Sequence, residues 1–318
     1  MKIKALIAYD GSEGADAALN DLQRAGLGNS VEVIILSVAE LWLPPPPPSA
    51  GPNEAFPLYT PPGLKSARET VAQAIEEVRS LAKGASARVQ AVFPSWKVST
   101  EVFTGSPAWE VIKKADKWEP DLVIVGSQGR SALGRLFLGS VSHKIITEAR
   151  CSVRVGRRSI TAGGVSMRVL VGVDGSPGAE AAVQAVAKRE WPADTEIRVI
   201  AVQDPSVPLA LGNLNPQVTE WIGKADEGDR QWVRKMVEAS SEDLRGAGLN
   251  VSSLIKEGDA KKVLVDEAKR LGADCIFVGS TGFSNRLERF LLGSVSAAVA
   301  NRAECSVEVI RKEPVKEA

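Results

Sequence analysis

Apolar runs long enough to fill a strand alternate along this chain with stretches whose apolar residues recur at helical spacing. Residues 3–9 form the first such run, and Ala15, Ala18, Leu19 and Leu22 form the helical stripe that follows it. The alternation continues to the end of the chain and is typical of a parallel sheet with helices on both faces. Burial on both faces also explains why the strands are continuous apolar runs. The sequence therefore predicts an α/β fold.

Each half of the chain is predicted to contain the same series of elements. Short helices are expected to begin at Pro107 and Ala260, and a further helix precedes the last strand of each half. The expected strands include 3–9, 31–38, 87–93, 122–125 and 152–155 in the first half, and 195–202, 250–256, 275–278 and 306–310 in the second.

The two series match because the sequence repeats itself once. Asp10-Gly-Ser returns as Asp174-Gly-Ser, 164 positions later. Matches that keep one order over 318 residues indicate two tandem domains rather than a solenoid of short repeats. The expected domains are residues 1–158 and 167–312, joined by a short polar segment that contains Gly163-Gly164. Two further pairs of segments return in the same order, 125–129 as 278–282 and 138–142 as 292–296.

Composition excludes several classes of protein. Lysine plus arginine equals aspartate plus glutamate, 39 each, so nothing favours bulk attraction to nucleic acid or anionic lipid. No apolar run approaches the ~20 residues of a membrane-spanning helix, and the first residues lack the pattern of a signal peptide. Three cysteines, Cys151, Cys275 and Cys305, do not make a disulfide framework and are expected to be buried thiols. A cytoplasmic protein is expected.

The segment from Gly126 to Ser140 carries the chemistry. It begins where a predicted strand ends, contains Gly126, Gly129 and Gly139, and finishes where a helix begins. Glycines let backbone amides approach a ligand closely, and a helix N-terminus adds N–H donors that suit a phosphate. The Ser140 hydroxyl could add a donor or cap the helix. The segment lacks the Gly-Lys-Ser/Thr ending of a P-loop and follows the fourth strand, unlike the Rossmann fingerprint.

The spacing Gly-x₂-Gly-x₉-Gly-Ser resembles the ATP-binding signature of the universal stress protein family. The resemblance extends over nearly the whole chain, once in each half, and includes Asp10-Gly-Ser and Asp174-Gly-Ser at the ends of strands. It implies two doubly wound five-stranded parallel sheets of strand order 3-2-1-4-5, as in adenine nucleotide alpha hydrolase-like proteins. That order places the ends of strands one and four side by side, where open α/β sheets bind ligands.

The resemblance also implies which residues hold an adenine nucleotide. Asp10 would contact the nucleoside or its bound metal, and the backbone at Val38 would meet the adenine. The glycines and helix start would line ribose and phosphates. The residues implied in the first half are Asp10, Val38, Gly126, Gly129, Gly139, Ser140 and Val141, and in the second Asp174, Val202, Gly279, Gly282, Gly293, Ser294 and Val295.

The second glycine loop differs from the first in two respects. Ten residues separate Gly282 from Gly293, where nine separate Gly129 from Gly139, and Glu288 adds a negative charge. The extra residue could be absorbed as a bulge, or it could displace the helix start from the phosphates. Loop arginines in both halves could counter phosphate charge or could simply be solvated; they are Arg130, Arg135, Arg286 and Arg289.

Dedicated catalysis is not expected. His143 is the only histidine, its counterpart is Ala297, and no cluster has metal-ligand spacing. No motif supports Ser-His-Asp catalysis, so no catalytic or metal-ligating residue is assigned. The expected function is an ATP-binding stress-response switch or binding module, with or without Mg²⁺. The alternatives are a slow ATPase or nucleotide hydrolase at the same site, and a structural module that binds nothing.

The last expectations concern assembly and one unusual loop. Family domains pair through their last strands, which here implies that residues 153–155 pair with residues 307–309 inside one chain and hide two sheet edges. An isolated half is then expected to self-associate, and a homodimer of whole chains is left open.

The proline run 44–48 and the prolines after it indicate a stiff surface loop, or else a lid or a docking motif.

Overall fold

The computed structural model describes residues 2–40, 62–129, 138–157, 166–203, 216–280 and 292–311. The N-terminal half contains β1 (Ile3–Ala8), α1 (Glu13–Asp21), the 3₁₀ helix η1 (Leu22–Arg24), β2 (Val31–Ala39), α2 (Pro62–Val92), β3 (Lys97–Thr104), α3 (Pro107–Trp118), β4 (Leu122–Gly126), α4 (Ser140–Glu148) and β5 (Ser152–Gly156). The C-terminal half contains β6 (Arg168–Val173), α5 (Pro177–Ala187), β7 (Glu196–Gln203), α6 (Pro216–Gly246), β8 (Asn250–Glu257), α7 (Ala260–Leu271), β9 (Cys275–Gly279), α8 (Ser294–Arg302) and β10 (Ser306–Ile310).

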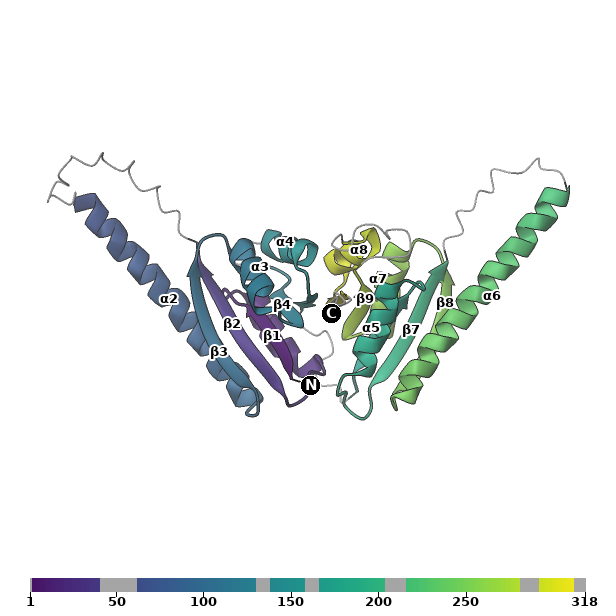
Figure 1. Cartoon of the computed structure of the whole chain (residues 1–318), viewed down its shortest axis with the longest axis horizontal. Coiled ribbons are helices and arrows are strands. Elements are labelled where there is room, and N and C mark those ends of the chain that lie inside the picture. The colour runs from purple at the N-terminus through teal and green to yellow at the C-terminus, as the bar shows by residue number, and fades with distance from the viewer. Residues whose placement is uncertain are drawn as a thin grey trace, which may run out of the picture.

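These strands form one sheet in the order β3-β2-β1-β4-β5-β10-β9-β6-β7-β8. Within each half the order is 3-2-1-4-5 and the strands are parallel, as the resemblance implies. The halves join where β5 and β10 pair antiparallel, so the expected pairing of 153–155 with 307–309 is confirmed. The long helices α2 and α6 lie at the two outer sides of the molecule, and α4 and α8 lie near its centre (Figure 1).

The helices cover both faces of the sheet and divide the apolar core into three clusters. One cluster lies under α1 and α2, and a second lies under α5 and α6. The third contains buried residues of α3, α4, α7 and α8, and it is continuous across the junction of β5 with β10. The two halves therefore share one core on this face of the sheet.

The predicted third strand of the first half is wrong. Residues 87–92 alternate apolar and polar side chains, but they continue helix α2, and the strand is β3, which begins at Lys97. Ala82, Ala85 and Val89 continue the helical period and are buried against the core, so their packing overrides the short alternating pattern. The helix ends only before Pro94, where a turn leads into β3.

Two of the three cysteines are buried thiols, as expected. Cys275 and Cys305 are buried and Cys151 is half-buried. Burial raises the pKa of Cys151 to about 11, that of Cys305 to about 12, and that of Cys275 further still. No helix within the described ranges is both long and apolar enough to span a membrane.

Glu267 in α7 is fully buried, yet three cations surround its carboxylate. Arg270, Lys256 and Arg198 approach it to 2.6, 2.8 and 3.0 Å. The hydrogen bond from Arg270, with those from Lys256 and Arg198, outweighs the effect of burial and lowers the pKa of Glu267 to about 2. Because the folded pKa lies below the value of 4.5 expected for an unperturbed glutamate, its stabilisation is present above pH 4.5 and is lost as the pH falls toward 2.

Glu267→Gln is therefore expected to lower the free energy of unfolding by about 2 kcal/mol at pH 7. The difference from the wild type should shrink steadily between pH 4.5 and pH 2 in urea titrations. Glu238→Gln, which loses an exposed pair with Arg245, is the control and should change stability by less than about 1 kcal/mol. A loss of stability in Glu267→Gln that does not change with pH would contradict the lowered pKa of Glu267.

Candidate functional site

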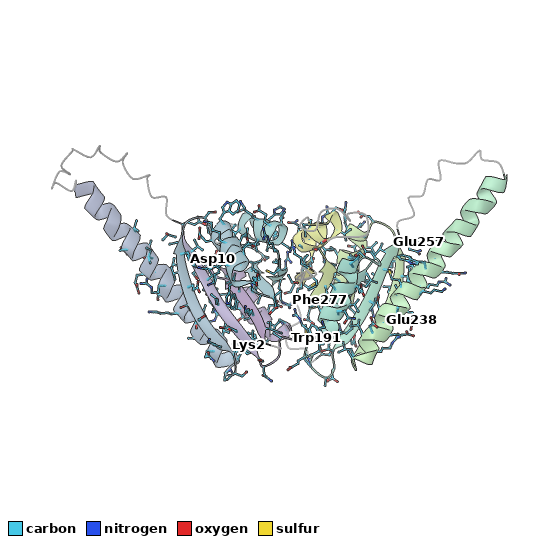
Figure 2. All side chains as sticks on the ribbon, in the orientation of Figure 1. Lys2, Asp10, Trp191, Glu238, Glu257 and Phe277 are labelled. Atoms are coloured by element: carbon cyan, nitrogen blue, oxygen red, sulfur yellow. The ribbon has the colours of Figure 1, made fainter. Side chains whose placement is uncertain are left out.

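The turns that follow β1 and β4 are tied together by Asp10, Ser12 and Gln128. Ser12 caps helix α1 by accepting the Ala15 amide, and its hydroxyl donates to the Gln128 carbonyl at 3.1 Å. The Ser12 amide donates to Asp10 Oδ1 at 2.9 Å, which orients the carboxylate at this end of the sheet (Figure 2). Two motifs more than 110 residues apart in sequence thus form one site, as the strand order predicts.

Glycines allow helix α1 to approach the end of strand β4 closely. A Cβ added to Gly14 would lie 2.0 Å from the Gln128 carbonyl oxygen, and one added to Gly126 would lie 2.4 Å from the Gly14 carbonyl carbon. Gly126 is thus needed for packing α1 against the end of β4. Gly129 lies beside the carboxylate instead, since its added Cβ would be 3.1 Å from Asp10 Oδ2.

Helix α4 points its N-terminus at the same place. Its N-cap is Gly139, whose amide donates to the Ser127 carbonyl at 2.8 Å, and the Ser142 hydroxyl donates to the Gly126 carbonyl at 2.6 Å. These two bonds fix the helix start against the end of β4. Ser140 is the first helical residue and does not cap α4, so that part of the expectation is wrong, because the backbone of Gly139 occupies the cap position.

The N-caps of α4 and α8 are glycines, which bring no side chain to the free amides of the first turn. Side chains of Ser12, Ser176 and Asp259 cap α1, α5 and α7, whereas α3, α4 and α8 begin without a side-chain cap. The first-turn amides at Ser140 and Val141, with the positive end of the helix dipole, are therefore suited to an anionic ligand.

Val38 lies near the end of β2, beside the end of β1. Strand β1 ends at Ala8, and the Tyr9 amide donates to the Leu36 carbonyl. Because carbonyls of alternate residues in a strand point the same way, the carbonyl of Val38 points past the end of β1. A planar base placed there could be met by the backbone of Val38.

The C-terminal half repeats this geometry. Asp174 Oδ1 accepts the Ser176 amide at 2.9 Å, and a Cβ on Gly279 would lie 2.4 Å from the Gly178 carbonyl carbon. The Gly293 amide donates to the Ser280 carbonyl at 2.6 Å, as Gly139 does to Ser127. The extra loop residue therefore does not displace the start of α8 from the end of β9. The alternative of a displaced helix is wrong.

The second site has an aromatic side chain beside its Asp-Gly-Ser turn. The indole of Trp232, on α6, packs on Gly175, whose added Cβ would lie 2.6 Å from Trp232 Cη2. Trp232 is half exposed, and Asp174 beside it is exposed, whereas Asp10 is half-buried. The two sites thus share their backbone frame and differ in the exposure of their aspartates.

Comparison with known proteins identifies this frame. The model of the universal stress protein family matches residues 3–157 and again residues 166–311. The chain belongs to the universal stress protein family. A universal stress protein of Mycobacterium tuberculosis is 29% identical over 319 residues, with 96% of each chain covered, and one of Mycolicibacterium smegmatis is 27% identical over 308 residues, also with 96% of each covered. A solved universal stress protein of Archaeoglobus fulgidus matches with a TM-score of 0.62 and 22% identity, covering 97% of this chain and 98% of the other, which supports the fold.

The residues at both edges of this universal stress protein fit an adenine nucleotide. Asp10 and Asp174 offer a carboxylate oriented by a backbone amide, and a Cβ added to Gly139 would lie 3.6 Å from the Gly129 nitrogen. No group of three or more His, Cys, Asp and Glu in the described ranges could hold a metal ion without the ligand. Any Mg²⁺ would therefore depend on phosphate oxygens for most of its coordination.

Three polar side chains behind the first site, those of Tyr9, Asp16 and Arg88, interact with one another. Burial and a hydrogen bond to Asp16 raise the pKa of Tyr9 to about 12, so the phenol stays neutral. Burial opposes ionisation of Asp16, but hydrogen bonds from Arg88 and Tyr9 lower its pKa. His143 is exposed on the second turn of α4 and has no catalytic partner among the contacts described for it.

Sequence reasoning missed Gly14 and its counterpart Gly178. The signal was present, because the two glycines recur 164 positions apart next to the Asp-Gly-Ser motifs. Other expectations lie outside the described residues, namely Gly282, Arg130, Arg135, Arg286, Glu288, Arg289, the proline-rich loop and most of the segment that joins the halves.

Proposed function

We propose that this universal stress protein is a cytoplasmic, nucleotide-dependent stress-response switch that binds ATP, with or without Mg²⁺, at two sites, one in each of the domains 1–158 and 167–312. The observation that carries the proposal is the convergence of Asp10, Gly129 and the glycine-capped start of α4. A carboxylate beside a helix N-terminus suits a ligand that is a hydroxyl donor at one end and an anion at the other.

Each residue then has a role in binding. Asp10 accepts hydrogen bonds from the ribose or holds a phosphate-bound metal, and the Val38 backbone meets the adenine. Gly129, Gly139, Ser140 and Val141 offer their amides, and the Ser140 hydroxyl, to the phosphates, while Gly126 keeps α1 close. The corresponding set in the C-terminal half is Asp174, Val202, Gly279, Gly282, Gly293, Ser294 and Val295.

A binding role is favoured over dedicated catalysis. Asp10 is the one carboxylate that the described contacts place beside Gly129, and one of its two oxygens already accepts the Ser12 amide. Slow hydrolysis of ATP at the same site is the second candidate function. Steady release of ADP or AMP that stops in Asp10→Asn would favour hydrolysis.

The deciding experiment is mass spectrometry of small molecules released when freshly purified protein is denatured, followed by calorimetric titration with ATP, AMP and cAMP. AMP and cAMP are included because an Arabidopsis thaliana family protein has been solved with AMP bound, and a universal stress protein in complex with cAMP. Two equivalents of ATP are expected. No released nucleotide and no heat of binding with any of the three would overturn the proposal.

Asp10→Asn is expected to weaken nucleotide binding at the first site by about tenfold to a hundredfold, which corresponds to a lost charge-assisted hydrogen bond of about 1.5–3 kcal/mol. Asparagine keeps an oxygen for the Ser12 amide, so the midpoint of thermal unfolding without ligand should barely change. Asp174→Asn should weaken the other site alone. Glu13→Gln, an exposed neighbour in α1, is the control. Unchanged affinity in both aspartate variants would contradict the assignment.

A further inference from the structure

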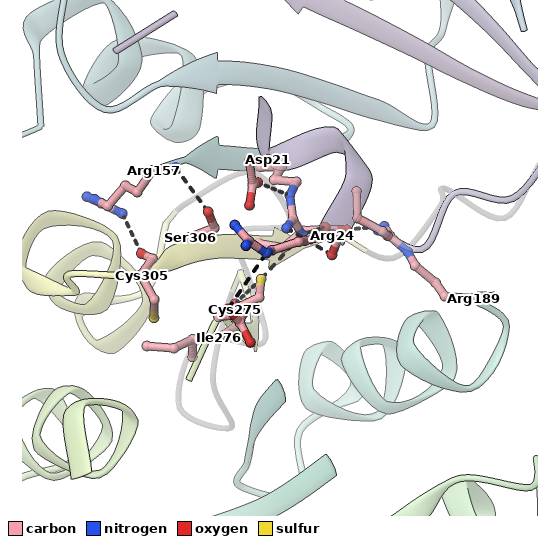
Figure 3. A network of polar contacts seen from close by, with 12 residues as sticks. Asp21, Arg24, Arg157, Arg189, Cys275, Ile276, Cys305 and Ser306 are labelled. Carbon is pink, nitrogen blue, oxygen red and sulfur yellow. Dashed lines mark hydrogen bonds and ion pairs between the residues drawn. The ribbon is translucent and has the colours of Figure 1, made fainter. Parts of the chain in front are cut away.

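The two halves meet through surfaces that are not alike. At the junction of β5 and β10, Arg154 pairs with Glu308 in the strand register. Both side chains are fully buried, and Arg154 Nη1 donates to Glu308 Oε2 at 3.0 Å. Each half also supplies a partner of its own, because Arg154 Nε donates to Asp21 at 2.7 Å and Arg189 pairs with Glu308 (Figure 3).

Arg154 and Glu308 occupy the same place in the two halves. Each is the middle residue of the Val-x-Val strand that follows Cys-Ser. Two N-terminal halves paired in this register would set Arg154 against a second Arg154, and two C-terminal halves would set Glu308 against Glu308. Each like pair keeps its own Asp21 or Arg189 but loses the opposite charge across the junction. Like charges directly opposite each other, in a buried position, are destabilising.

The joining surfaces of the two halves also differ in shape, and this difference, like the charge difference, favours pairing of unlike halves. The segment 25–28, after η1, corresponds to 189–192, after α5, at the repeat distance of 164 residues. The first segment is Ala-Gly-Leu-Gly and the second is Arg-Glu-Trp-Pro. The Glu190 amide donates to the Gly26 carbonyl at 3.0 Å, so the two segments lie against each other in the folded chain.

The glycines of the first segment make room for the bulk of the second. A Cβ on Gly26 would lie 3.1 Å from Arg189 Cβ and 3.2 Å from Trp191 Cε3, and one on Gly28 would lie 2.6 Å from Glu190 Oε1. Two C-terminal halves would bring two bulky segments together. Two N-terminal halves would leave the space next to each glycine unfilled, at a cost in packing.

Some other contacts across the junction are the same in both directions. Arg157 donates to the carbonyls of Ala300 and Cys305, and Arg311 donates to those of Ile146 and Cys151 in the same way. These reciprocal bonds between each half and the last helix of the other would hold like halves as well as unlike ones. Discrimination is therefore assigned to the charge pair and to the segments 25–28 and 189–192, to which the contact of Arg24 with Asp274 at 3.8 Å is a further one-way addition.

We propose that this junction is a recognition surface that accepts the unlike half and rejects a like one. An isolated N-terminal half is then not expected to form the self-association that its strand edge alone predicts. Whole chains can use this junction between molecules only by exchanging halves, so that each N-terminal half pairs with a C-terminal half of the partner chain.

The direct test starts from the intact folded protein with a protease site inserted within residues 158–165. After cleavage, the sample is partly dissociated in mild urea, returned to buffer and examined by native mass spectrometry. The mixed pair of fragments should exceed each like pair by about tenfold or more, which corresponds to about 1.4 kcal/mol. Like and mixed pairs in the proportions of random pairing would overturn the proposal.

Variants of the uncut chain test the same point without requiring the fragments to refold. Glu308→Arg builds the arginine-on-arginine contact of a like pair into one molecule, and Glu308→Leu removes the charge pair without adding repulsion. The midpoint of thermal unfolding should fall further in Glu308→Arg than in Glu308→Leu. Equal midpoints in these two variants would show that like charges are tolerated and would overturn the charge part of the proposal.

Gly26→Leu tests the shape part in the same way. Its matched control is Gly248→Leu, because Gly26 and Gly248 have φ angles of +62° and +82°, but only Gly26 faces the other half, and nothing lies within 4 Å of a Cβ at Gly248. Gly26→Leu should lower the unfolding midpoint more than the control does, and should raise the share of like pairs among cut fragments. An equal fall of the unfolding midpoint in Gly26→Leu and Gly248→Leu would overturn the shape part of the proposal.

Discussion

Gly14→Ala is expected to lower the free energy of unfolding by about 3 kcal/mol, although alanine is the better helix former. The new methyl group would lie 2.0 Å from the Gln128 carbonyl oxygen, and this oxygen belongs to the backbone and cannot rotate away. Helix α1 must therefore move off the end of β4, which also separates Asp10 from Gly129. Urea unfolding measures the first effect and calorimetric titration with ATP the second.

Gly84→Ala is the matched control for this prediction. Gly84 lies in the exposed face of α2, with nothing within 4 Å of an added Cβ. The same substitution should stabilise the protein there by about 0.5–1 kcal/mol, because alanine loses less conformational freedom on folding. If Gly14→Ala proved as stable as the wild type, the close approach of α1 to β4 would be contradicted, and the arrangement of the site with it.

Arg154→Leu is expected to cost about 3–5 kcal/mol, because it leaves two buried carboxylates without their shared cation. Asp21 contacts Arg154 within the first half and Glu308 contacts it across the junction, and all three side chains are almost fully buried. Burial alone would lower the pKa of Arg154, but Asp21, Cys275 and Glu308 raise it, so the guanidinium stays charged. Chemical denaturation at pH 7 measures the loss.

Arg88→Leu provides the comparison for a surface pair. Arg88 contacts Asp16 at 2.5 Å, but both side chains are more than 40% exposed, so water screens the interaction. This substitution should cost less than about 1 kcal/mol. Similar losses of stability in Arg154→Leu and Arg88→Leu would mean that burial does not increase the contribution of the ion pair at the junction.

Much of the fold could be predicted from the sequence because the evidence for it was local or was repeated. Continuous apolar runs identified the buried strands, and the repetition of Asp10-Gly-Ser as Asp174-Gly-Ser identified the two halves. The pairing of the last strands, however, followed from the family resemblance, not from the pattern of residues. The predicted helix starts were correct, since α4 and α8 begin immediately after Gly139 and Gly293.

What the sequence did not predict depends on contacts between distant segments. The stretch 87–92 fits a strand by its alternation, and only the packing of Ala85 and Val89 on the sheet keeps it helical. The need for glycine at position 14 depends on a carbonyl more than 110 residues away. The match of Gly26 to Arg189 and Trp191 likewise exists only once the halves are joined.

The separation of β5 from β10 along the chain has a consequence for synthesis on the ribosome. Strand β5 ends at Gly156 and its neighbour β10 ends at Ile310, so about 150 residues separate their synthesis. At ~5–20 residues per second the finished first half waits on the order of ten to thirty seconds with the Arg154 edge uncovered. The nearest candidates for pairing on a messenger RNA carrying several ribosomes are identical first halves of neighbouring nascent chains. An edge that rejects its own copy keeps these chains apart until each has made the strand that fits it.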